Sequence, residues 1–357
     1  MRLSFVLPAS PGGGGAHSIV QESSELAALG VDVRLVVKAQ DLVSFRCYYG
    51  ASLSPRLAIS SYETAPDIVR AISGSDFVVA TTYGSVRLIT DAMGIVAGAR
   101  VPRLAYYVQD YEPFFCTPGS EEWIEARESY TLGEGTLLFA KTRWLCEQVA
   151  LLHRCRVHKV EPSVDHQIFR PDLAGTRGKV AVCAMVRPST PRRAPARTMR
   201  VLSWIVEERE GVEVHAFGCD ASALDALDVT RHPDVRFHGE LAREQVAQVL
   251  RSCDFFLDLS DYQAFGRTGV EAMASGCVPV MPSLGAAPEL VTDSIDGFIV
   301  DTSNELAVFE AVSVALGLSE SERHGMKSAA LERASAFSLR RAAVSEYRLF
   351  ADALYDG

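Results

Sequence analysis

The order of elements from Phe255 to Met281 constrains the fold more than any other feature of this chain. The apolar run Phe255–Leu259 is short enough for a buried strand, and Cys277–Met281 is a second run of this kind. Between them lie a loop with Gly266 and a stretch with apolar residues at helical spacing that ends at Gly276. Two strands joined by a helix in this way predict a parallel sheet, with the loop and the start of the helix at the edge where the first strand ends.

The same alternation of strand and helix patterns runs through the whole chain. It predicts a doubly wound α/β fold, whose ligands bind at the carboxyl ends of the parallel strands. The expected strands are Leu3–Leu7, Val31–Val37, Asp76–Ala80, Arg103–Val108, Thr136–Phe139, His158–Val160, Lys179–Met185, Val212–Phe217, Val235–Phe237, Asp254–Leu259 and Val278–Met281. The expected helices of the first half are Ala16–Leu29, Thr64–Ile72, Tyr83–Val96, Glu121–Tyr130 and Arg143–His153.

Length and charge narrow the class of protein. The 357 residues exceed what one hydrophobic core usually organises, so we expect about two domains. The net charge of −10 disfavours nucleic acid as a partner and gives no general attraction to anionic membranes. No apolar run approaches the roughly 18 residues of a membrane-spanning helix. The first apolar run ends at Pro8, and we interpret it as a strand and not as a signal peptide.

The eight cysteines show no C-x-x-C pair and lie scattered in apolar surroundings. This pattern predicts buried thiols in a reducing compartment, and it gives no indication of a structural zinc site.

A glycine loop follows the first expected strand, with four consecutive glycines at residues 12–15. Glycine lets the backbone approach a ligand closely because it has no side chain, so Gly14 and Gly15 are candidates for a binding site. The loop is not a G-x-G-x-x-G motif, and a merely flexible turn explains it equally well.

A second candidate site follows the expected strand that ends at Val108. Residues 109–115 read QDYEPFF and place Asp110 and Glu112 among aromatic side chains such as Tyr111. Aromatic rings pack on the apolar faces of sugars, and carboxylates accept hydrogen bonds from sugar hydroxyls, so the composition is typical of a carbohydrate site. The alternative is a loop whose aromatic residues fill the core.

Three arginines, Arg187, Arg192 and Arg193, lie in the loop after the strand Lys179–Met185 and immediately before a helix. Guanidinium groups match the planar oxygens of a diphosphate, and the N-terminus of the next helix adds to the positive field. The alternative is a solvated basic loop.

The helix after Gly266 also favours an anion. Its first amides, near Arg267 and Thr268, point outward unpaired and carry about half a positive charge, so a phosphate fits there. Glu271 lies about one turn inside the helix, where a carboxylate can bind two sugar hydroxyls. A solvated acid near the helix start is the alternative.

The residues around Glu271 carry a resemblance to a known family. The sequence has Gln263, then Phe265-Gly266, then VEAMASG over residues 270–276. This window resembles the donor-binding signature of the retaining GT-B glycosyltransferases of glycosyltransferase family 4. The chain departs from the signature at Gln263, where the family has its first Glu, and it matches elsewhere in the window.

The resemblance implies an α/β fold of the GT-B kind, with two Rossmann-like domains facing across a cleft and a C-terminal helix that crosses back to the first domain. Residues 1–171 would form an N-terminal acceptor-binding domain, 172–178 a linker, 179–337 a C-terminal nucleotide-sugar-binding domain, and 338–357 the returning helix. It further implies transfer of a sugar from a nucleoside diphosphate to a hydroxyl with the anomeric configuration retained. The only small molecules expected are the nucleotide-sugar donor and the acceptor, with no metal, because arginines would neutralise the diphosphate.

The family's functional positions map onto three sets of residues in this chain. The resemblance implies a catalytic set of Arg187, Arg193, Gln263 and Asp110. It implies a donor-binding set of Gly14, Gly15, Arg187, Arg192, Arg193, Gln263, Phe265, Gly266, Arg267, Thr268 and Glu271. It implies an acceptor-binding set of His17, Gln109, Tyr111 and Glu112.

The donor that the resemblance implies is dTDP-L-rhamnose. Within the family, QDYEP followed by aromatic residues is similar to rhamnosyltransferases that build rhamnose-containing surface glycans. The acceptor stays open between a glycan and a small molecule. We expect a cytoplasmic protein without nucleic-acid partners, and we leave open a peripheral contact with the inner face of the membrane and a homodimer.

Gln263 has more than one interpretation. An amide accepts at one end and donates at the other, so it suits a differently arranged pair of hydroxyls, such as that of a 6-deoxyhexose. The same change, together with Gln109 at a position where the family often has His, also fits a protein that binds a nucleotide sugar for a partner enzyme without transferring it. A GT-B-fold epimerase or phosphorylase is the third alternative.

Overall fold

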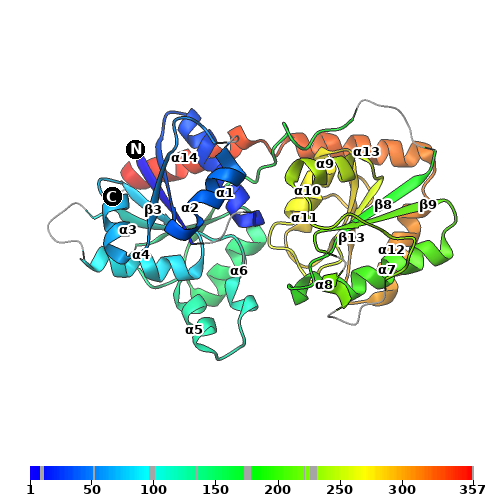
Figure 1. Ribbon diagram of the computed structural model, residues 1–357, viewed down its shortest axis with the longest axis horizontal. Helices are drawn as coiled ribbons and strands as arrows, with labels where there is room; N and C mark the ends of the chain where they lie inside the picture. The colour runs from blue at the N-terminus through cyan, green and yellow to red at the C-terminus, as the bar shows by residue number, and fades with distance from the viewer. Residues whose placement is uncertain are drawn as a thin grey trace. The chain divides into compact units, whose positions relative to one another are not determined.

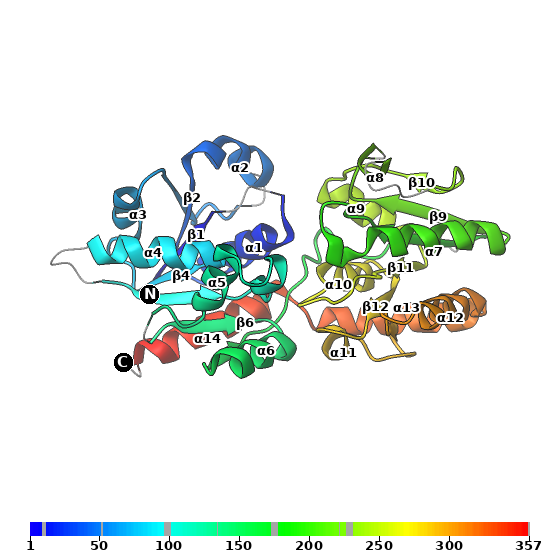
Figure 2. The same cartoon turned by 90° about the horizontal axis from the view of Figure 1, so that it is seen from below.

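The computed structural model describes residues 1–8, 12–50, 53–95, 101–133, 135–172, 178–220, 222–225 and 231–355. They form two compact units (Figure 1; Figure 2). Unit 1 is Met1–Ser163 with Leu339–Gly357, and unit 2 is Val164–Ser338. Each unit contains one sheet in which all the paired strands run parallel. The predicted α/β architecture with two Rossmann-like domains is confirmed.

Unit 1 has a seven-stranded sheet in the order β3-β2-β1-β4-β5-β6-β7. Its strands are β1 (Arg2–Leu7), β2 (Asp32–Lys38), β3 (Ala58–Tyr62), β4 (Phe77–Ala80), β5 (Arg103–Tyr107), β6 (Leu137–Ala140) and β7 (Val157–Lys159). Its helices are α1 (Gly14–Ala28), η1 (Ala39–Asp41), α2 (Leu42–Tyr49), α3 (Ala65–Ile72), α4 (Tyr83–Ile95), η3 (Glu112–Phe115), α5 (Glu121–Glu128), α6 (Arg143–His153) and α14 (Leu339–Tyr355).

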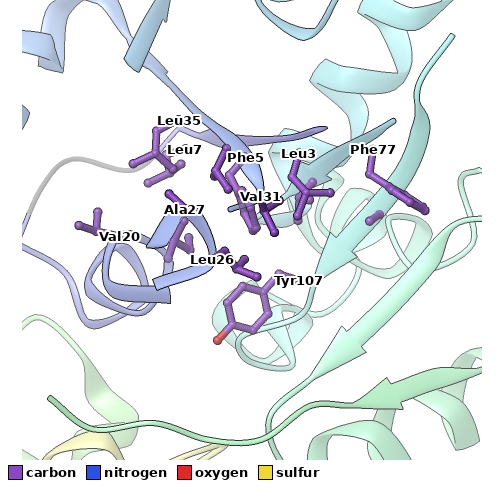
Figure 3. Packing of buried hydrophobic residues seen from close by; sticks show 14 of the residues in the cluster. Leu3, Phe5, Leu7, Val20, Leu26, Ala27, Val31, Leu35, Phe77 and Tyr107 are labelled. Atoms are coloured by element: carbon purple, nitrogen blue, oxygen red, sulfur yellow. The ribbon is translucent and has the colours of Figure 1, made fainter. Parts of the chain in front are cut away.

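The core on one face of this sheet follows the two-residue period of the strands. Leu3, Phe5 and Leu7 of β1 point to the same face, where Figure 3 shows them packed with Val20 and Leu26 of α1. All five side chains are almost fully buried. Helices α1, α2 and α14 contribute to this cluster, and α3 and α4 pack against the sheet and against each other.

The last helix, α14, belongs to unit 1, as predicted. Ala343 and Phe350 are buried in the same cluster as α1. The ring of Phe350 lies 5.1 Å from that of Phe77 and 5.5 Å from that of Phe139, measured between centroids. Figure 1 shows α14 in red close to α1 in blue, and the two helices are in contact.

A buried polar cluster also joins α14 to α1 and β6. Lys141 forms an ion pair with Glu22, and Ser163 Oγ donates a hydrogen bond of 2.6 Å to Glu22 Oε1. Glu346 of α14 is 1% exposed. Burial and the neighbouring carboxylate of Glu22 raise the pKa of Glu346 well above its ordinary value, against the opposing effect of Lys141. Burial in this cluster therefore favours the protonated form of Glu346 over the ionised form.

Unit 2 has a six-stranded sheet in the order β10-β9-β8-β11-β12-β13. Its strands are β8 (Val180–Met185), β9 (Val212–Phe217), β10 (Arg236–Phe237), β11 (Phe255–Leu257), β12 (Val278–Pro282) and β13 (Phe298–Val300). Its helices are η4 (Pro191–Arg193), α7 (Pro195–Glu208), α8 (Ser222–Asp225), α9 (Arg243–Arg251), α10 (Arg267–Ala274), α11 (Ala287–Leu290), α12 (Glu305–Gly317) and α13 (Glu320–Ser335).

Each sheet of this order has a switch point, where the direction of strand addition reverses and where ligands of open α/β sheets bind. In unit 1 the switch point lies between β1 and β4, and in unit 2 it lies between β8 and β11. In unit 2, α9, α10, α11 and α13 supply the apolar cluster on one face of the sheet, while α7, α8 and α12 pack on the other face. The fold thus leaves the loops after β8 and β11 side by side.

The boundary between the units lies earlier than the predicted end of the first domain at residue 171. Val164 and Phe169 are buried in a cluster of unit 2, and the amide of Val164 donates to the carbonyl oxygen of Phe337 at 2.8 Å. Residues 164–171 therefore pack in unit 2. Most of the predicted linker, residues 173–177, lies outside the described residues.

Two short elements of unit 1 are missing from the sequence predictions, namely β3 and α2. The strand β3 lies at the edge of the sheet, and only Tyr62 among its residues is buried, so it lacks the apolar run that marks the other strands. The helix α2 follows β2 after only one turn of 3₁₀ helix. Weak burial at an edge explains why hydrophobic patterning does not detect the strand.

Candidate functional site

Two loops of unit 2 meet at its switch point: the arginine loop, residues 186–194 after β8, and the glutamine loop, residues 258–266 after β11. The amide of Asp261 donates a hydrogen bond of 2.8 Å to the carbonyl oxygen of Arg192. Arg197 of α7 donates to the carbonyl oxygen of Leu259 at 2.8 Å and pairs with Asp261 at 2.9 Å. The two predicted donor-binding loops are therefore linked through their backbones.

The three arginines of the arginine loop differ in their surroundings. The guanidinium of Arg193 lies 3.9 Å from Asp258 Oδ2, and its side chain is 24% exposed. The guanidinium of Arg192 lies over the ring of Tyr262, 5.1 Å from the ring centroid. Arg187 is exposed. Two arginines thus lie against the glutamine loop, while the third extends into solvent.

Gln263 is buried against the carboxylate of Asp258. Its Nε2 donates to Asp258 Oδ2 at 2.6 Å and to Ser260 Oγ at 3.1 Å, while Ser260 Oγ donates to Asp258 Oδ1 at 2.5 Å. All three side chains are at most 6% exposed. Because an ionised carboxylate only accepts hydrogen bonds, the NH₂ group of the amide must face Asp258. Sequence reasoning misses Asp258 and Ser260, since residue types alone do not show which carboxylate faces the amide.

The backbone of Gln263 is held as firmly as its side chain. Its amide donates to the carbonyl oxygen of Leu284 at 3.2 Å, and its carbonyl oxygen accepts from the amide of Ala286 at 2.8 Å. Gly285 lies between these bonds with φ of +112°, and a Cβ atom there would collide with the carbonyl oxygen of Gln263. Only glycine permits this approach of the loop after β12.

Helix α10 begins where its first amides have no side-chain cap. Its N-cap residue Gly266 has φ of +75°, and no side chain of that residue caps the helix. Met281 packs under this turn so closely that a Cβ atom on Gly269 would lie 2.5 Å from its sulfur. Thr268 Oγ1 lies 3.9 Å from the sulfur of Met185, the last residue of β8. The start of α10 is therefore anchored next to the end of β8.

Glu271 is 6% exposed and lies among charged groups of unit 2. Burial raises its pKa to about 7, the charges of Arg267 and Arg243 oppose that shift, and Asp165 adds to it. Arg267 lies 3.9 Å from Glu271 Oε1, and its guanidinium lies over the ring of Phe265, 5.8 Å from the centroid. Arg243 and Asp165, which pair at 3.7 Å, are further neighbours that the sequence pattern does not single out.

In unit 1, the structure places Gly15 and Gln109 together at the switch point. Gly14 and Gly15 form the first turn of α1, and a Cβ atom on Gly15 would lie 2.8 Å from Gln109 Oε1. Gln109 Nε2 donates to the carbonyl oxygen of Thr81, just after β4, at 3.0 Å. A side chain at position 15 would therefore displace the end of the Gln109 side chain from its present place.

His17 of α1 is 8% exposed and packs among aromatic residues of α2. Its ring centroid lies 5.6 Å from that of Tyr48 and 5.4 Å from that of Tyr49. Tyr48, unlike His17, is exposed, with 46% of its surface accessible.

The structure gives Tyr111 a packing role instead of the predicted contact with an acceptor. Its side chain is 2% exposed, its hydroxyl lies 3.1 Å from His153 Nε2, and its ring stacks on Tyr130 with centroids 5.8 Å apart. The preceding Asp110 accepts a hydrogen bond of 2.9 Å from the amide of Tyr111. For Tyr111, the alternative interpretation of an aromatic loop that fills the core is the one that the structure supports.

Glu112 also makes internal hydrogen bonds, and its predicted contact with an acceptor stays a prediction. It is 8% exposed, and its Oε2 accepts hydrogen bonds from the amide of Tyr83 at 2.5 Å and from the hydroxyl of Tyr106 at 2.7 Å. Tyr83 begins α4, so the carboxylate binds an otherwise unpaired amide at a helix start. Burial raises the pKa of Glu112 to about 7, although both hydrogen bonds oppose the shift.

All eight cysteines are free, and four of them are buried, so the expectation of buried thiols holds for only half of them. Among the described residues, no group of three or more His, Cys, Asp or Glu side chains is arranged to hold a metal ion. The described helices include none that is both long and apolar enough to cross a membrane.

Comparison with known proteins finds a family match within the second unit. Residues 182–317 match the family model described as glycosyl transferases group 1. A D-inositol 3-phosphate glycosyltransferase of a Mycobacterium species (strain KMS) is 29% identical over 189 residues, which are 49% of this chain and 43% of that protein. The O-antigen biosynthesis protein RfbC of Myxococcus xanthus is 28% identical over 218 residues, which are 60% of this chain and 16% of RfbC. The chain thus spans less than half the length of these relatives.

Solved structures show the same fold over the whole chain. Sucrose-phosphate synthase from Thermosynechococcus elongatus has a TM-score of 0.80 at 14% identity, and HepE from Anabaena in complex with UDP-glucose has a TM-score of 0.80 at 16% identity. Each comparison covers 100% of both chains. The chain therefore has the two Rossmann-like units of the GT-B glycosyltransferases, and its second unit matches the group 1 glycosyl transferases.

Proposed function

We propose that the protein is a retaining glycosyltransferase that moves a sugar from a nucleoside diphosphate to an acceptor hydroxyl. The observation that carries this proposal is the meeting of Arg192, Arg193, Gln263 and the uncapped start of α10 at the switch point of unit 2. The match of residues 182–317 to the group 1 glycosyl transferases supports the same activity.

The arginine loop suits the leaving diphosphate. When the glycosidic bond breaks, negative charge grows on the diphosphate, and preorganised donors stabilise it by about 3 kcal/mol each. Arg193 and the exposed Arg187 would supply guanidinium donors, and the amides at the start of α10 would supply backbone donors. These cations and amides account for charge stabilisation without a metal ion, so we propose that transfer requires none.

Glu271 suits the ribose of the donor. Its carboxylate lies in the second turn of α10, is buried, and has a pKa of about 7 that leaves it partly ionised at neutral pH. An ionised carboxylate accepts hydrogen bonds from two neighbouring hydroxyls. In unit 1, Gly14, Gly15, His17 and Gln109 are the remaining candidates for contacts with the sugar or the acceptor, because Tyr111 and Glu112 are engaged internally.

The donor that we propose is dTDP-L-rhamnose, and the acceptor is a glycan or a small molecule. The resemblance of QDYEP to rhamnosyltransferases of surface-glycan biosynthesis supports the donor, and one relative is named for O-antigen biosynthesis. The solved relative HepE is named with UDP-glucose, so UDP-sugars are the donors to compare first. We place the reaction in the cytoplasm, where nucleotide sugars would be available.

The test is thermal unfolding of the pure protein with dTDP, UDP and GDP and with dTDP-rhamnose and UDP-glucose. A ligand at about one hundred times its dissociation constant stabilises the folded state by roughly 2.7 kcal/mol. A shift selective for dTDP and dTDP-rhamnose supports the proposed donor, and a shift with UDP and UDP-glucose replaces it. No shift with any nucleotide contradicts the proposed function.

A second measurement separates a transferase from its alternatives. We expect hydrolysis of the sugar from the donor, or its transfer to a hydroxyl, when the stabilising nucleotide sugar is incubated with the protein and analysed by NMR. An intact donor would indicate the non-catalytic binding partner, and a donor converted to its epimer would indicate an epimerase.

A further inference from the structure

The Asp258–Gln263 pair lies at the centre of the switch point of unit 2, and the proposed function does not explain it. Asp258 follows β11 directly and is 6% exposed, so the fold buries a carboxylate beside the predicted donor site. A buried carboxylate is costly unless it is paired and hydrogen-bonded. The carboxylate of Asp258 accepts hydrogen bonds from the amide group of Gln263 and from both the hydroxyl and the backbone amide of Ser260. The guanidinium of Arg193 lies 3.9 Å from Asp258 Oδ2.

The hydrogen bonds of this cluster determine which of its atoms donate and which accept. Ser260 donates its single hydroxyl hydrogen to Asp258 Oδ1, so its oxygen can only accept from Gln263. Both hydrogens of the Gln263 amide are then occupied, one by Asp258 and one by Ser260. The described residues provide no hydrogen-bond donor to Gln263 Oε1. The amide oxygen is the part of this side chain that remains for a ligand.

We propose that Asp258 is a positioning residue and that the Asp258–Gln263 pair determines how the donor sugar is recognised. Asp258 holds the amide so that Gln263 Oε1 accepts a hydrogen bond from a sugar hydroxyl, and it also orients Arg193. This inference rests on the proposed function. The chemical class of the ligand group is a hydroxyl, because only a hydrogen-bond donor can pair with the amide oxygen.

The same geometry explains why an amide and not a carboxylate occupies position 263. A Glu there would have no hydrogen to donate, and its oxygen would lie where Nε2 now lies, 2.6 Å from Asp258 Oδ2. Two carboxylates at that distance cannot both be ionised without strong repulsion. The backbone bonds of residue 263 to Leu284 and Ala286 prevent the loop from moving away. The residue types at 258 and 263 are therefore interdependent.

The experiment is a double-mutant cycle with Asp258→Asn, Gln263→Glu and the double variant. An Asn at 258 presents both a donor and an acceptor, so the Gln263 amide loses its fixed orientation. The double variant restores one charge and one amide with their positions exchanged. The probes are dTDP and dTDP-rhamnose, with UDP and UDP-glucose in parallel, and the measurement is the ratio of the dissociation constant of the diphosphate to that of its sugar conjugate.

We expect each single variant to lower this ratio about tenfold, the effect of losing one hydrogen bond to a charged or oriented group. The double variant should return to within about threefold of the wild-type ratio, since its interaction energy is large and favourable. Ratios that stay at the wild-type value in both single variants, or a double variant that is as poor as the product of the two single effects, would overturn the proposal.

Two controls separate the proposed role from a loss of folding. Asp225→Asn removes an exposed carboxylate that pairs with Arg231, and it should leave the ratio unchanged. The sugar-binding ratio of Gln263→Glu should also recover as the pH falls, because a shared proton removes the repulsion between the two carboxyl groups. A merely structural role predicts no such recovery, and a variant ratio that is independent of pH contradicts the proposal.

Nucleotide binding by the wild-type protein distinguishes a failure of the proposed function from a failure of this inference alone. If the wild type binds none of the four nucleotides, the proposed function fails and this inference fails with it. If the wild type binds a diphosphate and its sugar conjugate while the variants keep the same ratio, the inference alone fails. Ser260→Ala gives an independent check, because it removes one partner of the amide and leaves the charge of Asp258 in place. It should lower the ratio by a smaller factor than Asp258→Asn.

Discussion

The two sheets have the same strand order over six strands, and unit 1 has a seventh strand, β7, at one edge. The acids near their switch points nevertheless serve different purposes. In unit 1, Glu112 turns inward and binds the amide of Tyr83 at the start of α4. In unit 2, Asp258 holds Gln263 and approaches Arg193, while the start of α10 has no side-chain cap. The difference teaches that the position of a polar loop in an α/β fold does not reveal its role. What matters is whether its charged side chains are already hydrogen-bonded to backbone groups of the same unit.

The largest effect should follow from removing the cation of the arginine loop. Arg193→Met should lower the turnover of the donor by roughly a hundredfold to a thousandfold, the usual effect of losing one preorganised donor to a developing negative charge. The matched control is Arg200→Met, because Arg200 pairs only with the exposed Glu305 among the described contacts. An equal loss of turnover in the two variants would contradict a specific role for Arg193. Initial rates at saturating donor provide the measurement.

The next largest effect concerns the carboxylate of α10. Burial raises the pKa of Glu271 to about 7, so wild-type donor affinity should rise as the pH increases from 6 to 8 and the carboxylate ionises. Glu271→Gln should bind the donor about tenfold more weakly at pH 8, where the charged acceptor is lost, and nearly as well as the wild type at pH 6. Calorimetric titration at both values measures this. A loss that is the same at both values would contradict an ionised acceptor.

A stability effect without a binding effect should mark the acid of unit 1. Glu112→Ala leaves the amide of Tyr83 and the hydroxyl of Tyr106 without their buried partner, so it should lower the free energy of unfolding by about 1–3 kcal/mol. The affinity for nucleotides should stay unchanged. Glu128→Ala, at an exposed position of α5, serves as the control in urea unfolding. Weaker nucleotide binding by Glu112→Ala would show that the acid of unit 1, like that of unit 2, affects ligand binding.

The smallest effect should come from Glu346, and it should depend on pH. The pKa of Glu346 is raised in the folded state. Such a carboxyl group contributes its full share to the free energy of unfolding at pH values below its unfolded pKa, and this contribution falls as the pH rises above that value. Glu346→Gln keeps the shape of the protonated group and does not ionise. The variant should therefore gain stability relative to the wild type between pH 5 and pH 8.5 in urea unfolding. A difference that shrinks over this range would contradict a protonated Glu346.

Patterns of apolar residues predict much of this fold because strand burial and helix periodicity are local. They locate strands such as β8 and β12 within one or two residues of their observed ends. They also predict that the arginine loop and the glutamine loop lie at the same edge of one sheet. They miss β3, where burial is weak. The family resemblance places residues 164–171 in the first domain, but these residues pack in unit 2, where Val164 pairs with Phe337, a residue far away in sequence.

The side-chain contacts of the site are not predictable in this way. The sequence places Tyr111 and Glu112 in a composition typical of sugar sites, but their partners Tyr130, Tyr106 and Tyr83 belong to separate segments. A carboxylate with two internal donors looks the same in sequence as one that faces a ligand. Likewise, the interdependence of Asp258 and Gln263 follows from a distance of 2.6 Å and not from their spacing in the chain.

The return of α14 to unit 1 has a consequence for how the chain folds during synthesis. Unit 2 is an insertion between Ser163 and Leu339, so it leaves the ribosome before unit 1 can be completed. At roughly 5–20 residues per second, the interval is on the order of ten to forty seconds. Throughout it, the face of α1 that α14 later covers has no helix from its own unit to protect it. A chain that has been synthesised only as far as Ser338 therefore contains every residue of unit 2, while unit 1 still lacks the helix that covers α1.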